Sequence, residues 1–83
     1  MFRIVLHKTV SKKFDKLSRT DKKRISKAIE SIAIDPYIGK PLHGELKGSR
    51  RVRIGDFRII YDIDEPASVV IIHAIGSRGD VYK

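Results

Sequence analysis

The residues that constrain the fold most lie between Arg50 and Arg58, in the sequence Arg-Arg-Val-Arg-Ile-Gly-Asp-Phe-Arg. Gly55 and Asp56 separate two alternating runs, which is the signal of a β-hairpin with a two-residue type II′ turn. Such a turn fixes the register of the two strands, so Arg53 is expected directly opposite Arg58.

This hairpin divides its side chains between two faces, because successive residues of a strand point to opposite sides and paired residues share a side. One face is apolar and consists of Val52, Ile54, Phe57, Ile59, Tyr61 and Ile63. The other carries Arg51, Arg53 and Arg58. Like charges directly opposite each other destabilise a hairpin, so the arginines indicate a surface that binds a polyanion. Cross-strand ion pairing, for example with Asp62, is the structural alternative.

Two amphipathic helices are predicted before the hairpin. The first is indicated by apolar residues at helical spacing, Val10, Phe14 and Leu17. The second carries a longer stripe, Ile25, Ala28, Ile29, Ile32 and Ala33. Ser18 or Thr20 can cap this second helix. It is expected to end before Pro36, because the residue preceding a proline avoids the helical region.

The remaining segments complete a predicted α+β fold. Residues 2–6 are predicted to form a first strand, and the nearly continuous apolar run 68–75 is typical of a central strand. Residues 36–49 hold two prolines and three glycines and are predicted to be a loop. The order β-α-α-β-β-β predicts a two-helix hairpin packed on one face of a largely antiparallel four-stranded sheet. A single domain is expected over residues 1–83.

Composition limits the function further. The net charge of +8 favours a nucleic acid or another acidic partner through counterion release and steering, although a basic protein need not bind one. The absence of cysteine excludes disulfides and thiolate metal sites, and the scattered histidines predict no metal. No cofactor motif is present. No apolar run approaches the roughly 20 residues of a membrane span, and no signal peptide is expected, so we expect a cytoplasmic protein.

Much of the positive charge falls on the predicted helices. The residues predicted to dock phosphates of RNA or the ribosome are Lys12, Lys13, Lys16, Lys22, Lys23, Lys27 and, from the hairpin, Arg50. Contacts of this kind position a protein on RNA without reading its sequence. The alternative is an ordinary solvated helix face.

Three other residues have side chains that can take part in RNA chemistry. Tyr82 lies in the polar tail and can stack on an unpaired base, a contact worth roughly 1–3 kcal/mol; the alternative is a packed terminal aromatic. His73 lies inside the apolar strand and is predicted to be a buried or edge residue rather than a catalyst. His43 lies in the Gly/Pro loop, where nothing requires it to be functional.

Three segments resemble RelE-type toxins of the RelE/ParE superfamily, namely residues 41–48, 51–61 and 75–82. The middle segment is shared across the superfamily, whereas the ending Gly-x-Arg-x-x-Val-Tyr favours its RNA-cleaving branch. The resemblance implies one RelE-like toxin domain that enters the ribosomal A site and cleaves messenger RNA there. The ribose 2′-hydroxyl would attack the neighbouring phosphate without a metal or cofactor, and translation would stop. A RelB-like antitoxin that wraps the toxin and blocks its site is also implied.

The resemblance also assigns roles to individual residues. Arg51 and Arg53 match the two basic residues of the family's second strand, and Arg58 matches the arginine that steadies the transition-state phosphate. Arg78 matches the basic residue near the leaving group, and Tyr82 matches the aromatic that stacks on the substrate base.

One departure from the family concerns the general base. Relatives can carry lysines where this chain has Arg51 and Arg53, and a lysine with a lowered pKa can accept a proton, whereas arginine does not lose its own. Either charge stabilisation carries most of the rate here, or the base is another group, with His43 and Asp56 as nearby candidates.

Two other functions remain open at this point. One is a ParE-like toxin that binds a DNA topoisomerase and is not an enzyme. The other is a non-toxic basic module that binds nucleic acid.

Overall fold

The computed structural model describes residues 1–77, apart from the side chain of Glu45. In chain order its helices and strands are β1 (Arg3–Leu6), α1 (Lys8–Asp15), α2 (Arg19–Ile34), β2 (Lys40–Pro41), β3 (Arg50–Ile54), β4 (Phe57–Asp64) and β5 (Val69–Ser77). Two short 3₁₀ turns, Pro36–Ile38 and Gly44–Leu46, flank β2. Arg78 and Tyr82, two predicted site residues, lie outside the described residues.

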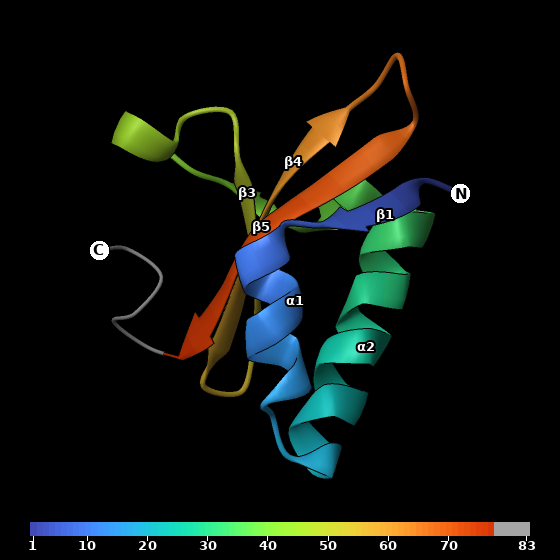
Figure 1. Cartoon of the computed structure of the whole chain (residues 1–83). Helices are drawn as coiled ribbons and strands as arrows, with labels where there is room; N and C mark the ends of the chain where they lie inside the picture. Colours follow the sequence, from blue (N-terminus) through green and yellow to red (C-terminus); the bar gives the residue numbers. More distant parts are fainter. Residues whose placement is uncertain (78–83) are drawn as a thin grey trace.

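The strands form one sheet in the order β1-β5-β4-β3-β2. β1 runs parallel to β5, and the other neighbouring pairs are antiparallel. Figure 1 shows α1 and α2 lying side by side against the sheet, which confirms the α+β fold with a two-helix hairpin on one face.

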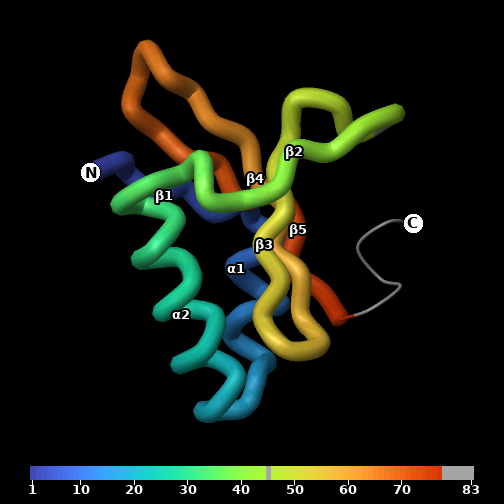
Figure 2. Tube along the Cα trace, turned by 180° about the vertical axis from the view of Figure 1, so that it is seen from behind, coloured from blue at the N-terminus to red at the C-terminus, as the bar shows by residue number. Residues whose placement is uncertain are grey.

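The sheet has one strand more than the sequence predicted. β2 comes from the segment predicted to be a loop, and it pairs Lys40 with Arg51 and Pro41 with Arg50. Figure 2 shows this segment passing beside β3 at the border of the sheet. A proline lacks the backbone N–H that a strand needs to donate on both sides, so it is tolerated at an edge. The pairing depends on tertiary contacts that a local pattern does not reveal.

The β3–β4 hairpin has the predicted register. Arg53 pairs with Arg58, and Ile54 pairs with Phe57. Gly55 has a φ of +57°, whereas Asp56 is not among the residues with positive φ. A positive φ at the first central position alone is the pattern of a type II′ turn, so the predicted turn is confirmed.

The apolar face of the hairpin packs against the helices. The buried core consists of Val10, Ile25, Ile32, Ile59, Tyr61, Val70, Ile72 and Ile75, and the other predicted members of the hairpin's apolar face pack against it. Ser18 caps α2, because its Oγ accepts a hydrogen bond from the backbone N–H of Asp21 at 3.1 Å. The helix ends one residue before Asp35, which precedes Pro36.

Tyr61 ties the segment after α2 to the centre of the sheet. Its buried hydroxyl donates to the Pro36 carbonyl at 2.6 Å and accepts from the Gly39 N–H at 3.1 Å. A Cβ at Gly39 would collide with this hydroxyl, so glycine is required there by space. Arg50 adds a bond from Nη1 to the Gly39 carbonyl at 2.7 Å. These contacts hold β2 beside β3.

Candidate nucleic-acid interface

The side of the sheet away from the helices, called the outer face below, carries two rows of cations. In the first row Arg53 of β3 lies opposite Arg58 of β4, and the β5 neighbour of Arg58 is Gly76, which adds no side chain. In the second row Lys40 of β2 lies opposite Arg51 of β3. We call these four residues the cationic cluster. They bring positive charges from three strands onto one surface.

Part of the cationic cluster borders a recess at the edge of the sheet. A cavity of about 290 Å³ is lined by Lys40, Arg51 and Arg53, together with Ile38 and Val52. Three cations around a concave surface concentrate positive potential more strongly than the same charges on a flat surface. The recess therefore offers a place where a phosphate can contact several guanidinium or ammonium groups at once.

A third row on the outer face holds Ser49, Asp62 and His73. The Ser49 hydroxyl donates to Oδ1 of Asp62. Nε2 of His73 lies 3.4 Å from the same carboxylate oxygen and 3.3 Å from Ser49 Oγ. This row continues the cationic rows along the strands, since Ser49 is two residues from Arg51.

His73 reaches the outer face because of an irregularity in β5. Ile60 pairs with Ala74 and the next residue, Tyr61, pairs with Ile72, so His73 has no partner on β4. Such a β-bulge inserts one residue into a strand and redirects side chains. His73 is thereby placed beside Asp62 instead of in the core.

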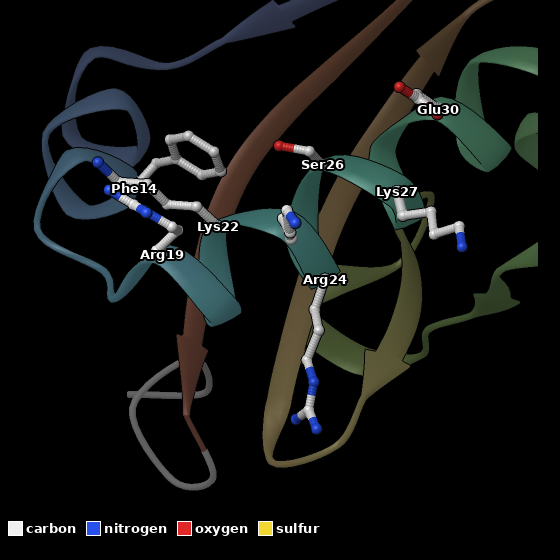
Figure 3. A pocket seen from close by; sticks show the side chains of 8 residues that line it. Phe14, Arg19, Lys22, Arg24, Ser26, Lys27 and Glu30 are labelled. Atoms are coloured by element: carbon white, nitrogen blue, oxygen red, sulfur yellow. The ribbon is translucent and has the colours of Figure 1, made fainter.

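The predicted helix lysines divide into two groups. Lys22, Lys23 and Lys27 line an open cavity of about 700 Å³ on α2, with further lining from Phe14, Arg19, Arg24, Ser26 and Glu30. Figure 3 shows the labelled side chains around this surface. The cavity is strongly basic, with Glu30 as its acidic member.

The second group, Lys12, Lys13 and Lys16, does not line this cavity. These lysines are exposed at the C-terminal end of α1, where cations interact favourably with the helix dipole. Their position therefore has a structural benefit that is independent of RNA binding.

Arg24 connects the helix cavity with the hairpin. In Figure 3 its side chain extends from α2 toward the β3–β4 turn. Its Nη1 lies 3.3 Å from the position that a Cβ on Gly55 would take. The basic surface of α2 is thus continued to the end of the hairpin that carries Arg53 and Arg58.

Arg50 differs from the other predicted arginines of the hairpin, because the structure does not bring it to the outer face. It pairs with Tyr61, whose side chain faces the helices. The Arg50 guanidinium also lies over the Tyr37 ring, 5.0 Å from its centroid. This arrangement gives Arg50 a structural role in holding residues 36–39.

Sequence reasoning missed Lys40 and the row formed by Ser49, Asp62 and His73. Lys40 precedes a proline in a Gly/Pro-rich segment, so no local signal predicted its pairing with Arg51. The sequence offered His43 and Asp56 as candidate bases, and both are exposed. His43 lies just before the second 3₁₀ turn, and Asp56 lies in the hairpin turn.

A family model described as "ParE toxin of type II toxin-antitoxin system, parDE" matches residues 4–82. The chain belongs to the RelE/ParE toxin superfamily. A curated relative supports the RelE type: the putative toxin RelE1 of Methanocaldococcus jannaschii is 33% identical over 86 residues, which covers 99% of this chain and 96% of that protein.

A second curated relative is similar over a shorter stretch. Toxin RelG of Mycobacterium tuberculosis is 39% identical over 46 residues, which is 55% of this chain and 53% of RelG. The match therefore spans about half the length of that relative.

Among solved structures, the archaeal RelE–RelB complex from Pyrococcus horikoshii contains a similar chain. Its TM-score is 0.76 at 25% identity, and the match covers 96% of this chain and 98% of that one. The resemblance noted in the sequence is thus confirmed, and the protein is a RelE-type toxin.

Two kinds of feature were not found in the part of the chain that the structure describes. Within residues 1–77, no helix is long and apolar enough to cross a membrane. In the same part of the chain, no three His, Asp or Glu side chains are grouped so that they could hold a metal ion.

Proposed function

We propose that this RelE-type toxin is a ribosome-dependent endoribonuclease that cleaves messenger RNA in the A site and thereby inhibits translation. The observation that carries the proposal is the cationic cluster, in which Arg53 and Arg58 lie directly opposite each other. Two like charges in this position destabilise the hairpin. A phosphate bound between the two guanidinium groups would offset this repulsion, because both groups are attracted to its negative charge.

The cationic cluster is proposed to bind the scissile phosphate of the messenger. Arg51, Arg53 and Arg58 would contact its non-bridging oxygens, because a guanidinium group matches phosphate geometry and stays charged at any working pH. Charge builds up on the phosphate as the 2′-oxygen attacks, and fixed cations stabilise that charge. Arg58 would contribute most, since it lies on the inner of the two arginine-bearing strands and is half-buried.

The helix surface would hold the toxin on the ribosome. Lys22, Lys23 and Lys27 line one basic cavity, and Arg24 links that cavity to the hairpin. Contacts from such residues to RNA phosphates would orient the outer face toward the messenger. Lys12, Lys13 and Lys16 would add affinity from α1, and Arg50 would act through the structure of residues 36–39.

Two further roles come from the family resemblance. Arg78 would act near the leaving group, and Tyr82 would stack on the substrate base. A RelB-like antitoxin is proposed as the partner, because the similar solved chain occurs in a RelE–RelB complex. An antitoxin of this kind would cover the cationic cluster with acidic groups. The cytoplasm is the proposed location, since ribosome, messenger and antitoxin would meet there.

The experiment that tests this proposal maps cuts in a messenger held on ribosomes, with the parent protein and with Arg58→Ala. The parent should cut within the A-site codon and leave free RNA intact. Arg58→Ala should cut roughly 100- to 1000-fold more slowly, as when one charge-stabilising donor is removed from an active site. Arg3→Ala is the matched control, because Arg3 is exposed on the distant edge strand β1.

Three outcomes would contradict parts of the proposal. If Arg58→Ala cuts as fast as the parent, the role assigned to this residue is wrong. If the parent cuts free RNA equally well, the protein is a ribonuclease without ribosome dependence. If expression damages DNA and leaves messengers intact, the protein is a ParE-like toxin, a candidate that the name of the matching family model favours.

A further inference from the structure

We propose that His73, held by Asp62 and Ser49, accepts the proton of the attacking ribose 2′-hydroxyl. This inference rests on the proposed endoribonuclease function and supplies the base that its arginines cannot provide. Arginine keeps its proton in proteins, whereas imidazole is the side chain best suited to exchange a proton near neutral pH.

The sheet places His73 close to the proposed phosphate site. Ala74, the next residue in β5, lies opposite Ile60, and Ile60 lies opposite Arg51. Asp62 follows Ile60 by two residues on the same face, a separation of roughly 7 Å along the strand. The imidazole is therefore about one row from Arg51, a gap that a bound nucleotide can bridge with its phosphate at the arginines and its ribose near the histidine.

The hydrogen bonds around His73 assign its tautomer. The Ser49 hydroxyl uses its proton to bond Asp62 Oδ1. Nε2 of His73 faces that same carboxylate oxygen and the Ser49 oxygen, at 3.4 and 3.3 Å. Both of these atoms are hydrogen-bond acceptors in this arrangement, so Nε2 carries the hydrogen and Nδ1 carries the lone pair. Nδ1 is the nitrogen that can accept a proton.

The row formed by Ser49, Asp62 and His73 is buried at its Ser49 side and exposed to solvent at His73 and Asp62. Ser49 is buried, with 7% of its surface exposed, and its backbone bonds Leu46 and Leu42 at 3.0 and 2.9 Å. By contrast, 30% of the His73 side chain and 48% of the Asp62 side chain are exposed. A substrate can thus reach the imidazole while its partners keep it oriented.

The proposed step balances as follows. The 2′-hydroxyl proton passes to His73 Nδ1, and the 2′-oxygen forms a bond to phosphorus. The bond between phosphorus and the 5′-oxygen breaks, and the 5′-oxygen leaves with the electron pair and takes a proton from water. The products are a 2′,3′-cyclic phosphate and a 5′-hydroxyl. The imidazolium then returns its proton to solvent.

Charged groups on two strands lie around this step. Asp62 on β4 faces the imidazole directly. Arg51 on β3 is one row away and Arg58 on β4 is two rows away, where they would contact the phosphate. Ser49 is neutral and fixes the geometry of the carboxylate.

The test measures single-turnover cleavage of a messenger on ribosomes across pH 5 to 8, where an imidazole ordinarily titrates. His73→Gln should cut at least 100-fold more slowly than the parent, which is the usual contribution of a general base, and its rate should lose the rise with pH that the parent shows. Asp62→Asn should slow cleavage less than His73→Gln does, because the imidazole remains but loses the carboxylate that orients it. His7→Asn is the control, since it removes an exposed imidazole and keeps a residue that can cap α1.

A merely structural role for His73 is tested by chemical rescue. Added imidazole should restore part of the activity of His73→Ala, because it can occupy the vacated space and accept the proton. It should not rescue Arg58→Ala. Denaturant unfolding of each variant establishes that the folded fraction is the same in both comparisons.

Two outcomes would overturn the inference while leaving the proposed function intact. One is that His73→Gln keeps the parental rate and pH profile while Arg58→Ala is inactive. The other is that His43→Gln, and not His73→Gln, removes the pH dependence. If the parent itself makes no cut on ribosomes, the proposed function fails and this inference fails with it.

Discussion

The two faces of the β3–β4 hairpin are made of alternating residues from the same strands, but they have opposite effects on the stability of the fold. On the helix side, Ile59 and Tyr61 are fully buried in the core. On the outer side, Arg53 and Arg58 oppose each other. The first arrangement lowers the free energy of the folded chain, whereas the second raises it.

Within the hairpin, the residues that stabilise the fold are therefore different from the residues proposed to bind RNA. A residue on the helix side is expected to change stability when substituted. A residue of the cationic cluster is expected to change RNA binding and to affect stability little, or favourably. Four substitutions test this separation.

The largest expected effect comes from Ile59→Ala. Ile59 is fully buried between the sheet and the helices, and removing such a side chain leaves a cavity that costs about 2–5 kcal/mol. Denaturant unfolding measures the loss. Val5→Ala is the control, because Val5 is 40% exposed and its truncation leaves no cavity, so the loss there should be much smaller. An equal loss at both positions would show that burial on the helix side does not set the contribution of Ile59.

Tyr61→Phe should cost about 1–3 kcal/mol at neutral pH, because it leaves the buried Pro36 carbonyl and Gly39 N–H without their partner. Burial raises the pKa of the Tyr61 phenol above its ordinary value of 10.

The sign of the pH effect follows from this direction. Below the ordinary pKa both states hold the proton, and the contribution of Tyr61 is complete. Above it the unfolded chain loses the proton first, so the folded chain binds more protons and stability falls with rising pH. Unfolding above pH 10 should therefore bring the parent closer to Tyr61→Phe. A gap that stays constant would contradict the assignment.

Arg53→Thr should stabilise the protein by roughly 0.2–1 kcal/mol, since it removes a like charge directly opposite Arg58. The same change should weaken RNA cleavage. Val52→Thr is the matched control at the neighbouring position, and it should destabilise by about 1 kcal/mol because it brings a hydroxyl to the apolar face. If both substitutions shift the unfolding midpoint in the same direction, the separation of the two faces is lost.

The smallest expected effect is that of Lys40→Gln, measured as the salt dependence of binding to single-stranded RNA. The slope of log K against log salt should fall by about 0.7, which corresponds to one phosphate contact. Arg3→Gln removes a charge at the opposite edge of the sheet and should leave the slope unchanged. A Lys40→Gln slope identical to that of the parent would remove this residue from the binding surface.

The sequence predicted the hairpin correctly because its turn is local. Gly55 and Asp56 set the register, and the register alone determines which side chains share a face. The helices were also predictable, since Ser18 supplies a cap and Pro36 marks the end of the second helix within short stretches of chain.

Lys40 and His73 could not be placed in this way. Lys40 joins the cationic cluster through a pairing with a strand ten residues later in the chain, and its neighbour Pro41 argues against a strand. His73 lies inside an apolar run, so the sequence predicted a buried or edge residue, and regular alternation from Ile75 would indeed put it on the core side. The bulge reverses that assignment. The roles of Arg51, Arg53, Arg58, Arg78 and Tyr82 remain predictions for the experiments above.

The parallel pairing of β1 with β5 has a consequence for how the toxin is made. Residues 3–6 are synthesised before the rest of the sheet, but they pair with residues 69–72. Contacts between such distant parts of a chain close large loops and form slowly. The sheet therefore cannot be completed on a nascent chain until residues 69–77 have been synthesised. A product truncated before residue 69 would lack β5, which is the neighbour of both β1 and β4, so its sheet would be incomplete.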